Sequence, residues 1–375
     1  MKFSPELIEA ACGYETPFFL MDRDVLLRKY SEVRDSIAGV EVFYAVKANP
    51  HPAVLDCLAR AGCGFEVSSC RELELALAAG ATPDKIVSYN PVKAPAFLAQ
   101  AHHAQVSTFA FDSAGELDKL AAAAPGCRAV ARLVVNNAGS EWPLCGKYGM
   151  DARLSLELLW VAARKGLEPH GLTFHVGSQC LNKENWVDAL YLCHQVWELA
   201  ERKGLHLELL SLGGGLPVCH GKKTPTTREI GAGIEASLRE LFPKRRPRLA
   251  MEPGRALVGE AAVLVTTVIG RASRGSEEWL YLDAGVFNAV FEASQGIRYQ
   301  VETERKGPRR PFTLAGPSCD SADTICQGVM LPNLQVGDRA YLMNAGAYTL
   351  SYASHFNGFP PPPVYFRVQG LASMV

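Results

Sequence analysis

The sequence predicts an α/β protein: a (β/α)8 TIM-like barrel followed by a mainly β C-terminal domain. Two observations predict the barrel. Short apolar segments alternate with longer amphipathic ones, and eight such alternations fill most of the roughly 250 residues that this fold needs. A third observation predicts the second domain, because strand-like segments continue after about residue 260 without long helical segments between them. An open doubly wound sheet also alternates strands with helices, so periodicity alone leaves that alternative open.

Eight short segments rich in Val, Ile, Phe and Tyr have the length and composition of buried strands. They are residues 40–46, 64–69, 85–90, 107–112, 128–135, 172–177, 207–213 and 248–254. Several of the amphipathic segments between them begin with capping-box spacing, which marks the start of a helix. The pairs are Ser69 with Glu72, Ser113 with Glu116, and Thr226 with Glu229.

Beyond residue 260, five segments predict strands separated by turns. They are AAVLVTTVIG, EEWLYLDAGVF, PFTLAG, RAYLMNAGAY and PVYFRVQ. We therefore assign residues 23–259 to the barrel and residues 260–375 to the β domain. Residues 1–22, which include the apolar PFFLMD, are expected to join the β domain.

The composition is that of an ordinary globular protein, with 375 residues, 48% hydrophobic and 21% charged, and a net charge of -1. This balance gives no sign of nucleic acid or an anionic membrane as a partner. No signal peptide and no apolar run of about 18 residues is evident. The eleven cysteines have no CxxC pairs or zinc spacing, which predicts free thiols, a cytoplasmic location and no metal site.

Polar residues fall near the carboxyl ends of the predicted barrel strands, where barrel enzymes carry their active sites. This convergence predicts an active site on that face. The residues are Lys47, Glu66, Asn90, Arg132, Asn136, His175, Ser178, Gly213, Gly214, Gly215, Glu252, Gly254 and Arg255.

Each of these residues has an ordinary explanation beside a functional one. Lys47 can carry its charge into water at a strand end, or it can be a desolvated lysine with a lowered pKa suited to Schiff-base chemistry. Glu252 can pair locally with Arg255, and His175 can be a satisfied core residue. The triplet Gly213–Gly215 can be a flexible turn, or it can let backbone amides approach an anion.

Cys319 and Asp320 lie side by side in the segment GPSCDSAD of the predicted β domain. A cysteine in such a turn is usually a small hydrophobic residue, and the aspartate a turn residue. For these two residues to meet the strand-end residues, a second chain or a fold-back is needed. The sequence leaves both possibilities open.

Six motifs follow one another in the order YAVKANP, FHVGSQ, SLGGG, EPGR, GPSCDSAD and GAYTLSYASHFNGF. In these motifs, which run from about Phe18 to Phe359, the chain resembles the fold-type III pyridoxal-phosphate (PLP) decarboxylases. It is most similar to the short bacterial members of the ornithine/lysine branch. The resemblance implies a PLP-binding barrel, a β domain, and a homodimer with two shared active sites.

The resemblance also implies roles for the matching residues. Lys47 would carry PLP as a Schiff base, His175 would stack on its ring, and Glu252 would keep the pyridine nitrogen protonated. Glu66 and Arg132 would be supporting residues of the barrel. The residues expected at the phosphate or elsewhere along the cofactor are Ser178, Gly213, Gly214, Gly215, Gly254, Arg255 and Tyr348.

The resemblance further implies that Cys319 and Asp320 reach the cofactor of the neighbouring subunit. Cys319 would protonate the substrate Cα after CO2 leaves, and Asp320 would bind the distal ammonium of the substrate. Diaminopimelate decarboxylases usually have Glu-Ser after the equivalent cysteine, so Asp320 favours a substrate with a distal ammonium. Glu292 is expected to supply a second carboxylate for that amine.

The expected activity is therefore decarboxylation of a basic L-amino acid, ornithine to putrescine or lysine to cadaverine. Three alternatives stay open at this point. They are a diaminopimelate-type decarboxylase, a decarboxylase of a modified amino acid in a specialised pathway, and a non-catalytic regulatory homologue. Intact Lys47, Cys319 and Glu252 argue against the regulatory homologue.

Overall fold

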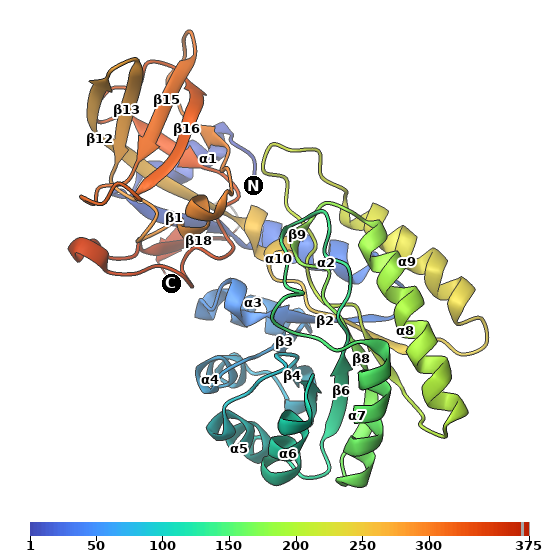
Figure 1. The fold of residues 1–375 in the computed structure, drawn as a ribbon. Helices are drawn as coiled ribbons and strands as arrows, with labels where there is room; N and C mark the ends of the chain where they lie inside the picture. Colours follow the sequence, from blue (N-terminus) through green and yellow to red (C-terminus); the bar gives the residue numbers. More distant parts are fainter. Residues whose placement is uncertain (369–370, 375) are drawn as a thin grey trace.

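The computed structural model describes residues 1–368 and 371–374, which form a barrel and a mainly β domain beside it (Figure 1). The eight short segments of the first part all become strands of one parallel sheet, in the order β4-β3-β2-β11-β10-β8-β6-β5. The strands are β2 (Val40–Ala45), β3 (Gly64–Glu66), β4 (Ile86–Val87), β5 (Thr108–Phe111), β6 (Arg128–Arg132), β8 (Glu168–Thr173), β10 (Leu209–Ser211) and β11 (Arg248–Met251).

A parallel bridge between Ser88 and Phe109 joins the two end strands of this sheet. The backbone N–H of Ser88 donates to Thr108 O at 3.1 Å, and the N–H of Ala110 donates to Ser88 O at 2.8 Å. This bridge closes the sheet into a barrel, so the predicted barrel is confirmed and the open doubly wound sheet is excluded.

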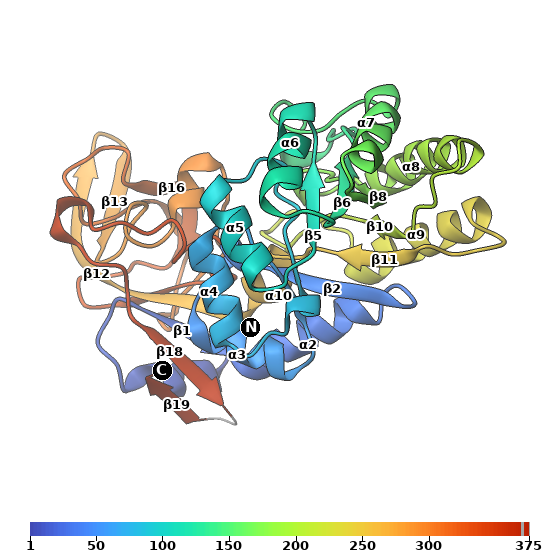
Figure 2. The same cartoon turned by 90° about the horizontal axis from the view of Figure 1, so that it is seen from below.

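Helices lie on the outside of the barrel, as the view from below shows (Figure 2). They are α2 (Arg23–Arg34), α3 (Pro52–Arg60), α4 (Cys70–Ala78), α5 (Pro95–His103), α6 (Ala114–Ala123), α7 (Ala152–Arg164), α8 (Glu184–Arg202) and α9 (Thr227–Leu241). The predicted caps form: Ser69, Ser113 and Thr226 each accept a hydrogen bond from the backbone three residues later. At Thr226 the reciprocal bond is also made, because its backbone N–H donates to the side chain of Glu229, and this completes a capping box.

The barrel interior is filled by its own apolar cluster. Because side chains alternate along a strand, this cluster marks inward-facing positions on six of the eight strands, β2, β4, β5, β6, β10 and β11. The members are Phe43, Val87, Tyr89, Ala110, Val130, Leu209 and Ala250. The residues between them, such as Val42 and Tyr44, pack outward in the large core under the helices.

The second sheet contains the N-terminal strand β1 and eight strands from the C-terminal part of the chain. Strand β1 lies between β12, to which it is antiparallel, and β18, to which it is parallel. The strands are β1 (Phe18–Asp22), β12 (Ala262–Arg274), β13 (Glu277–Leu282), β14 (Val301–Glu302), β15 (Arg310–Ala315), β16 (Thr324–Leu331), β17 (Arg339–Leu342), β18 (Val364–Val368) and β19 (Leu371–Met374). Each of the five segments predicted here contains a strand in the structure, although β13 and β17 end before their segments do, and Gln369 at the end of the last segment lies outside the described residues.

Short elements complete the described chain. The helices are α1 (Pro5–Cys12) and α10 (Arg255–Val258), and a small antiparallel pair is formed by β7 (Ser140–Trp142) and β9 (Ser178–Cys180). The 3-10 turns are η1 (Val46–Ala48), η2 (Pro83–Lys85), η3 (Gly259–Ala261), η4 (Phe291–Gln295) and η5 (Phe356–Gly358).

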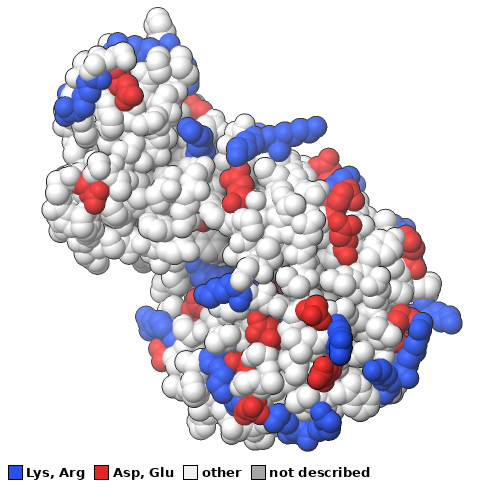
Figure 3. Space-filling model, in the orientation of Figure 1, with Lys and Arg blue, Asp and Glu red and all other residues white. Residues whose placement is uncertain are grey.

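None of the helices in the described residues has the length and apolar character that a membrane crossing requires. On the face drawn in Figure 3, basic and acidic side chains are interspersed, without a large area of one sign.

Candidate active site

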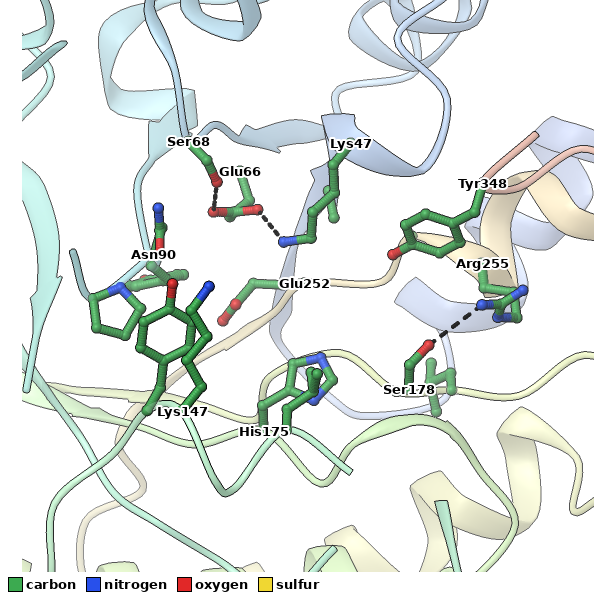
Figure 4. A pocket seen from close by; sticks show the side chains of 18 of the residues that line it. Lys47, Glu66, Ser68, Asn90, Lys147, His175, Ser178, Glu252, Arg255 and Tyr348 are labelled. Carbon is green, nitrogen blue, oxygen red and sulfur yellow. Dashed lines mark hydrogen bonds and ion pairs between the residues drawn. The ribbon is translucent and has the colours of Figure 1, made fainter. Parts of the chain in front are cut away.

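A cavity of about 440 Å³ opens at the carboxyl ends of the barrel strands. Ten of the residues predicted for the cofactor line it: Lys47, Glu66, Arg132, His175, Ser178, Gly215, Glu252, Gly254, Arg255 and Tyr348. In Figure 4, Arg255, Ser178 and Tyr348 gather at one end of the cavity, and Asn90 and Lys147 lie at the other. The strand-end residues therefore converge as the sequence predicts.

Alternation along the strands explains why these side chains meet. Arg132 lies two residues beyond the inward-facing Val130, and Glu252 lies two residues beyond the inward-facing Ala250. Each therefore continues the inward row of its strand at the carboxyl end. Lys47 likewise follows Phe43 at an even spacing, although β2 has already turned into η1 at that point.

Lys47 forms an ion pair with Glu66 inside the cavity, with Nζ 3.0 Å from Oε2. Ser68 Oγ donates to the other carboxylate oxygen of Glu66 at 3.2 Å. Partial removal from water acts to lower the pKa of Lys47, but Glu66 and weaker contributions from Tyr348 and Glu252 outweigh it, so the pKa is raised. The expectation of a lowered pKa is therefore wrong for the free amine, because sequence reasoning gave Lys47 no carboxylate partner.

Glu252 lies deep in the cavity and is 8% exposed. Ser211, the last residue of β10, donates a short hydrogen bond to Glu252 Oε1. Burial and the nearby charge of Glu66 raise the pKa of Glu252 to about 7, although the hydrogen bond from Ser211 and the charges of Arg132 and Lys47 oppose the rise. Such a carboxyl group is poised to accept or share a proton with a ring nitrogen at neutral pH.

Arg255 pairs with Glu292 and not with Glu252, so the local pairing considered for EPGR is wrong. Both nitrogens of the guanidinium fork, Nη1 and Nη2, lie 2.7 Å from an oxygen of Glu292. The reason is that Glu252 continues an inward strand row, whereas Arg255 begins helix α10. Glu292 itself does not line the cavity, in contrast to its expected contact with the substrate amine.

The Arg255 end of the cavity fits an anion. Arg255 Nη2 lies 3.4 Å from Ser178 Oγ, and its Nε is buried without a partner among the described residues. A Cβ atom on Gly215 would lie 2.4 Å from Gly177 O, and one on Gly213 would lie 2.2 Å from Phe174 O. An unused guanidinium donor beside a closely packed glycine turn is the arrangement that a phosphate group requires.

His175 lines the cavity, so it is not merely an enclosed core residue. Its Nδ1 accepts a hydrogen bond from the N–H of Gly177 at 3.0 Å. Burial first, and then the positive charges of Arg132 and Lys47, lower the pKa of His175 well below its ordinary value. A neutral, held imidazole of this kind offers a flat face to an aromatic ring in the cavity.

Cys319 and Asp320 lie outside the cavity, exposed in the loop between β15 and β16. The N–H of Cys319 donates to Asn357 Oδ1 at 3.2 Å, and Asp320 Oδ1 accepts from the N–H of Ala322 at 2.8 Å. The loop therefore does not fold back onto the cavity of its own chain. Of the remaining predicted residues, Gly213 and Gly214 pack behind the cavity wall, and Asn136 does not line it.

Several lining residues were missed by sequence reasoning. Tyr89 shares the inward row of β4 with Val87, and this spacing could have found it. Lys147 and Tyr148 come from the loop before α7, where no periodic signal exists, with Lys147 Nζ 5.0 Å from the centre of the Tyr148 ring. Ser68 and Tyr352 also line the cavity.

A lysine, a buried carboxyl group and an arginine beside a glycine turn, all in the cavity of one barrel, fit the class of enzymes that hold PLP on a barrel. Residues 23–259 match the family model described as pyridoxal-dependent decarboxylase, pyridoxal binding domain. The chain belongs to this family and is a PLP-dependent amino-acid decarboxylase.

Three relatives define its similarities further. The lysine/ornithine decarboxylase of Selenomonas ruminantium is 36% identical over 363 residues, covering 94% of this chain and 90% of that protein. The structure of lysine/ornithine decarboxylase from Vibrio vulnificus complexed with putrescine has a TM-score of 0.90 at 30% identity, covering 99% of this chain and 100% of the other. Antizyme inhibitor 2 of Xenopus laevis is 31% identical over 371 residues, covering 94% and 81%.

Proposed function

We propose that this decarboxylase removes the α-carboxylate of a basic L-amino acid, converting ornithine to putrescine or lysine to cadaverine. The observation that carries the proposal is the meeting of Lys47, Glu252 and Arg255 in one cavity. The names of the Selenomonas and Vibrio relatives support this substrate class.

In this proposal the residues of the cavity hold PLP along its length. Lys47 holds it through its ε-amine, His175 stacks on the ring, and Glu252 keeps the pyridine nitrogen protonated. When bound, PLP supplies the sink for the electrons released as CO2 leaves. Glu66 and Arg132 support the ring end. The residues proposed for the phosphate and the adjoining wall are Ser178, Gly213, Gly214, Gly215, Gly254, Arg255 and Tyr348.

We further propose that two copies of the chain share their sites. Cys319 and Asp320 are exposed and lie outside the cavity of their own chain, which leaves them free to enter the cavity of a second copy. There Cys319 would donate the proton to Cα, and Asp320 would accept a hydrogen bond from the distal ammonium. We also propose that the barrel comprises residues 23–259 and the β domain residues 260–375, joined by residues 1–22. The eleven free thiols support a cytoplasmic location.

Product analysis tests the substrate class. Purified protein loaded with PLP is offered L-ornithine, L-lysine, L-arginine, the D-enantiomers of the first two, and meso-diaminopimelate, and amine products are separated and identified. Rapid formation of putrescine or cadaverine is expected. Preferred turnover of meso-diaminopimelate would replace this proposal with the diaminopimelate-type activity. Failure to bind PLP at all would instead favour a regulatory homologue, in line with the name of the Xenopus relative.

Subunit mixing tests the shared site. Lys47→Ala and Cys319→Ala chains should each be inactive, and mixing them should restore part of the activity because one site of each heterodimer keeps both residues. Chains carrying different affinity tags allow subunit exchange to be confirmed by pull-down. Confirmed exchange without any recovery of activity would contradict a site built from two chains.

A further inference from the structure

Glu292 and Arg255 form a buried ion pair that joins the β domain to the barrel. Glu292 lies on η4, which follows β13, and Arg255 is the first residue of α10, directly after β11. Both distances between oxygen and nitrogen are 2.7 Å, and each side chain is only 5% exposed. A two-point bond between carboxylate and guanidinium fixes the plane and direction of the arginine as well as its position.

Two aromatic rings hold the faces of the same guanidinium. The Cζ atom of Arg255 lies 5.1 Å from the centre of the Trp142 ring and 4.9 Å from the centre of the Tyr348 ring. With Glu292 on one edge and rings against the group, the arginine has little freedom left to turn. Its orientation is therefore set before any ligand arrives.

Arg255 keeps N–H donors that Glu292 does not use. A guanidinium has five N–H donors. Glu292 takes one from Nη1 and one from Nη2, while Nη2 also lies 3.4 Å from Ser178 Oγ. Nε is buried and without a partner in the described part of the chain. Ser178 and Arg255 line the cavity together, and Figure 4 shows them at the end where Tyr348 lies.

We propose that Glu292 is a positioning residue for the phosphate of PLP, acting through Arg255 and not through the substrate. The inference rests on the proposed role of Arg255 at the phosphate. Glu292 offsets the charge of Arg255, so the site works mainly by directed hydrogen bonds from a pre-oriented fork. Both oxygens of Glu292 are engaged by Arg255, which leaves the distal ammonium of the substrate to Asp320 of the second copy.

Binding of two cofactor analogues to the PLP-free protein separates this role from others. PLP and pyridoxal share the aldehyde and the ring, but only PLP carries the phosphate. Each is titrated into the wild type and into Glu292→Gln and Glu292→Ala, and binding is followed by visible absorbance. We expect Glu292→Ala to weaken PLP binding roughly tenfold or more, about 1.4 kcal/mol, and to leave pyridoxal binding unchanged. Glu292→Gln should lie between, since its amide oxygen can accept one of the two bonds.

Two control variants fix the interpretation. Glu278→Ala removes ion pairs with Arg271 and Arg310 in the β domain, and its hydrogen-bond and ion-pair partners among the described residues do not line the cavity, so both affinities should stay at the wild-type values. Arg255→Met should weaken PLP binding at least as much as Glu292→Ala. If Arg255→Met leaves PLP binding unchanged, the phosphate role proposed for Arg255 fails, whatever Glu292 does.

The remaining outcomes decide the inference itself. Unchanged or tighter PLP binding in Glu292→Ala would overturn it, because the carboxylate would then only weaken the attraction between Arg255 and phosphate. Equal losses for PLP and pyridoxal would also overturn it, because Glu292 would then act on the fold of the whole site. If Glu292→Ala does not fold, the isosteric Glu292→Gln variant decides the question by the same ratio of affinities.

Discussion

Burial of Glu252 predicts that this residue destabilises the PLP-free protein as the pH rises. Burial and Glu66 raise the pKa of Glu252 from its ordinary 4.5 to about 7. One pKa unit corresponds to about 1.4 kcal/mol between the two protonation states. The ionised carboxylate therefore costs the folded protein about 3 kcal/mol relative to the protonated acid.

Folding stability falls with rising pH wherever the folded state binds more protons than the unfolded chain. Between pH 4.5 and 7 the folded protein keeps a proton on Glu252, whereas the unfolded chain has lost it. Folding stability from this group is fully present below pH 4.5 and is lost as the pH rises through about 7. Glu252→Gln keeps the size of the side chain and its acceptor for Ser211, and it removes the titration.

The assay is urea unfolding of the PLP-free wild type and of Glu252→Gln at several pH values from 4.5 to 8. Protein concentration is held constant, since association alters apparent stability. We expect the free energy of unfolding of Glu252→Gln, relative to that of the wild type, to increase with pH by about 3 kcal/mol over this range. Glu277→Gln, at the exposed first residue of β13, is the matched control for loss of one surface carboxylate. A difference between Glu252→Gln and wild type that stays constant with pH would refute the reasoning.

Three further predictions concern single residues. Lys47→Ala should abolish decarboxylation and the visible absorbance of bound PLP, and residual turnover in a product assay would rule out its proposed role. Gly215→Ala should strongly weaken PLP binding in absorbance titrations because its Cβ would lie 2.4 Å from a backbone oxygen, whereas Gly221→Ala, also at positive φ but in open space, should not. Lys93→Met should cost about 1–3 kcal/mol in urea unfolding because the buried carbonyls of Asn90 and Ala110 lose their donor, while Glu116, 2.9 Å from Lys93, keeps its pairing with Lys119; a cost below about 0.5 kcal/mol would contradict this.

The barrel could be predicted from the sequence because its strands are buried on both faces. Each such strand is a short, nearly continuous apolar run, and several are followed by a helix with a readable start. Strand β16 was missed for the opposite reason: most of its residues are exposed or half-exposed, so no apolar run marks it. The strands that pair with β1 could not be predicted, because β12 and β18 lie far along the chain and local patterns carry no information on pairing at that distance.

The site could be predicted only as far as strands position it. Arg132 and Glu252 end inward rows of parallel strands, so their convergence follows from alternation and the closure of the barrel. The partner of Arg255 could not be predicted in this way. The spacing in EPGR suggests Glu252, but the chain changes from strand to helix within those four residues and turns the two side chains apart. The actual partner, Glu292, lies on the 3-10 turn η4 of the β domain.

Alternation along the strand also places Ser211, which was not among the predicted site residues, beside Glu252. It lies two residues beyond the inward-facing Leu209, so its hydroxyl must face the barrel interior at the level of Glu252. It is fully buried there, donates to Glu252 and accepts a hydrogen bond from the N–H of Gly213. Burial and the charge of Glu66 raise the pKa of Glu252, whereas the hydrogen bond from Ser211 favours its ionised form. The serine before the glycine turn therefore links the two parts of the proposed cofactor site, the carboxyl group proposed for the ring nitrogen and the glycine turn proposed for the phosphate.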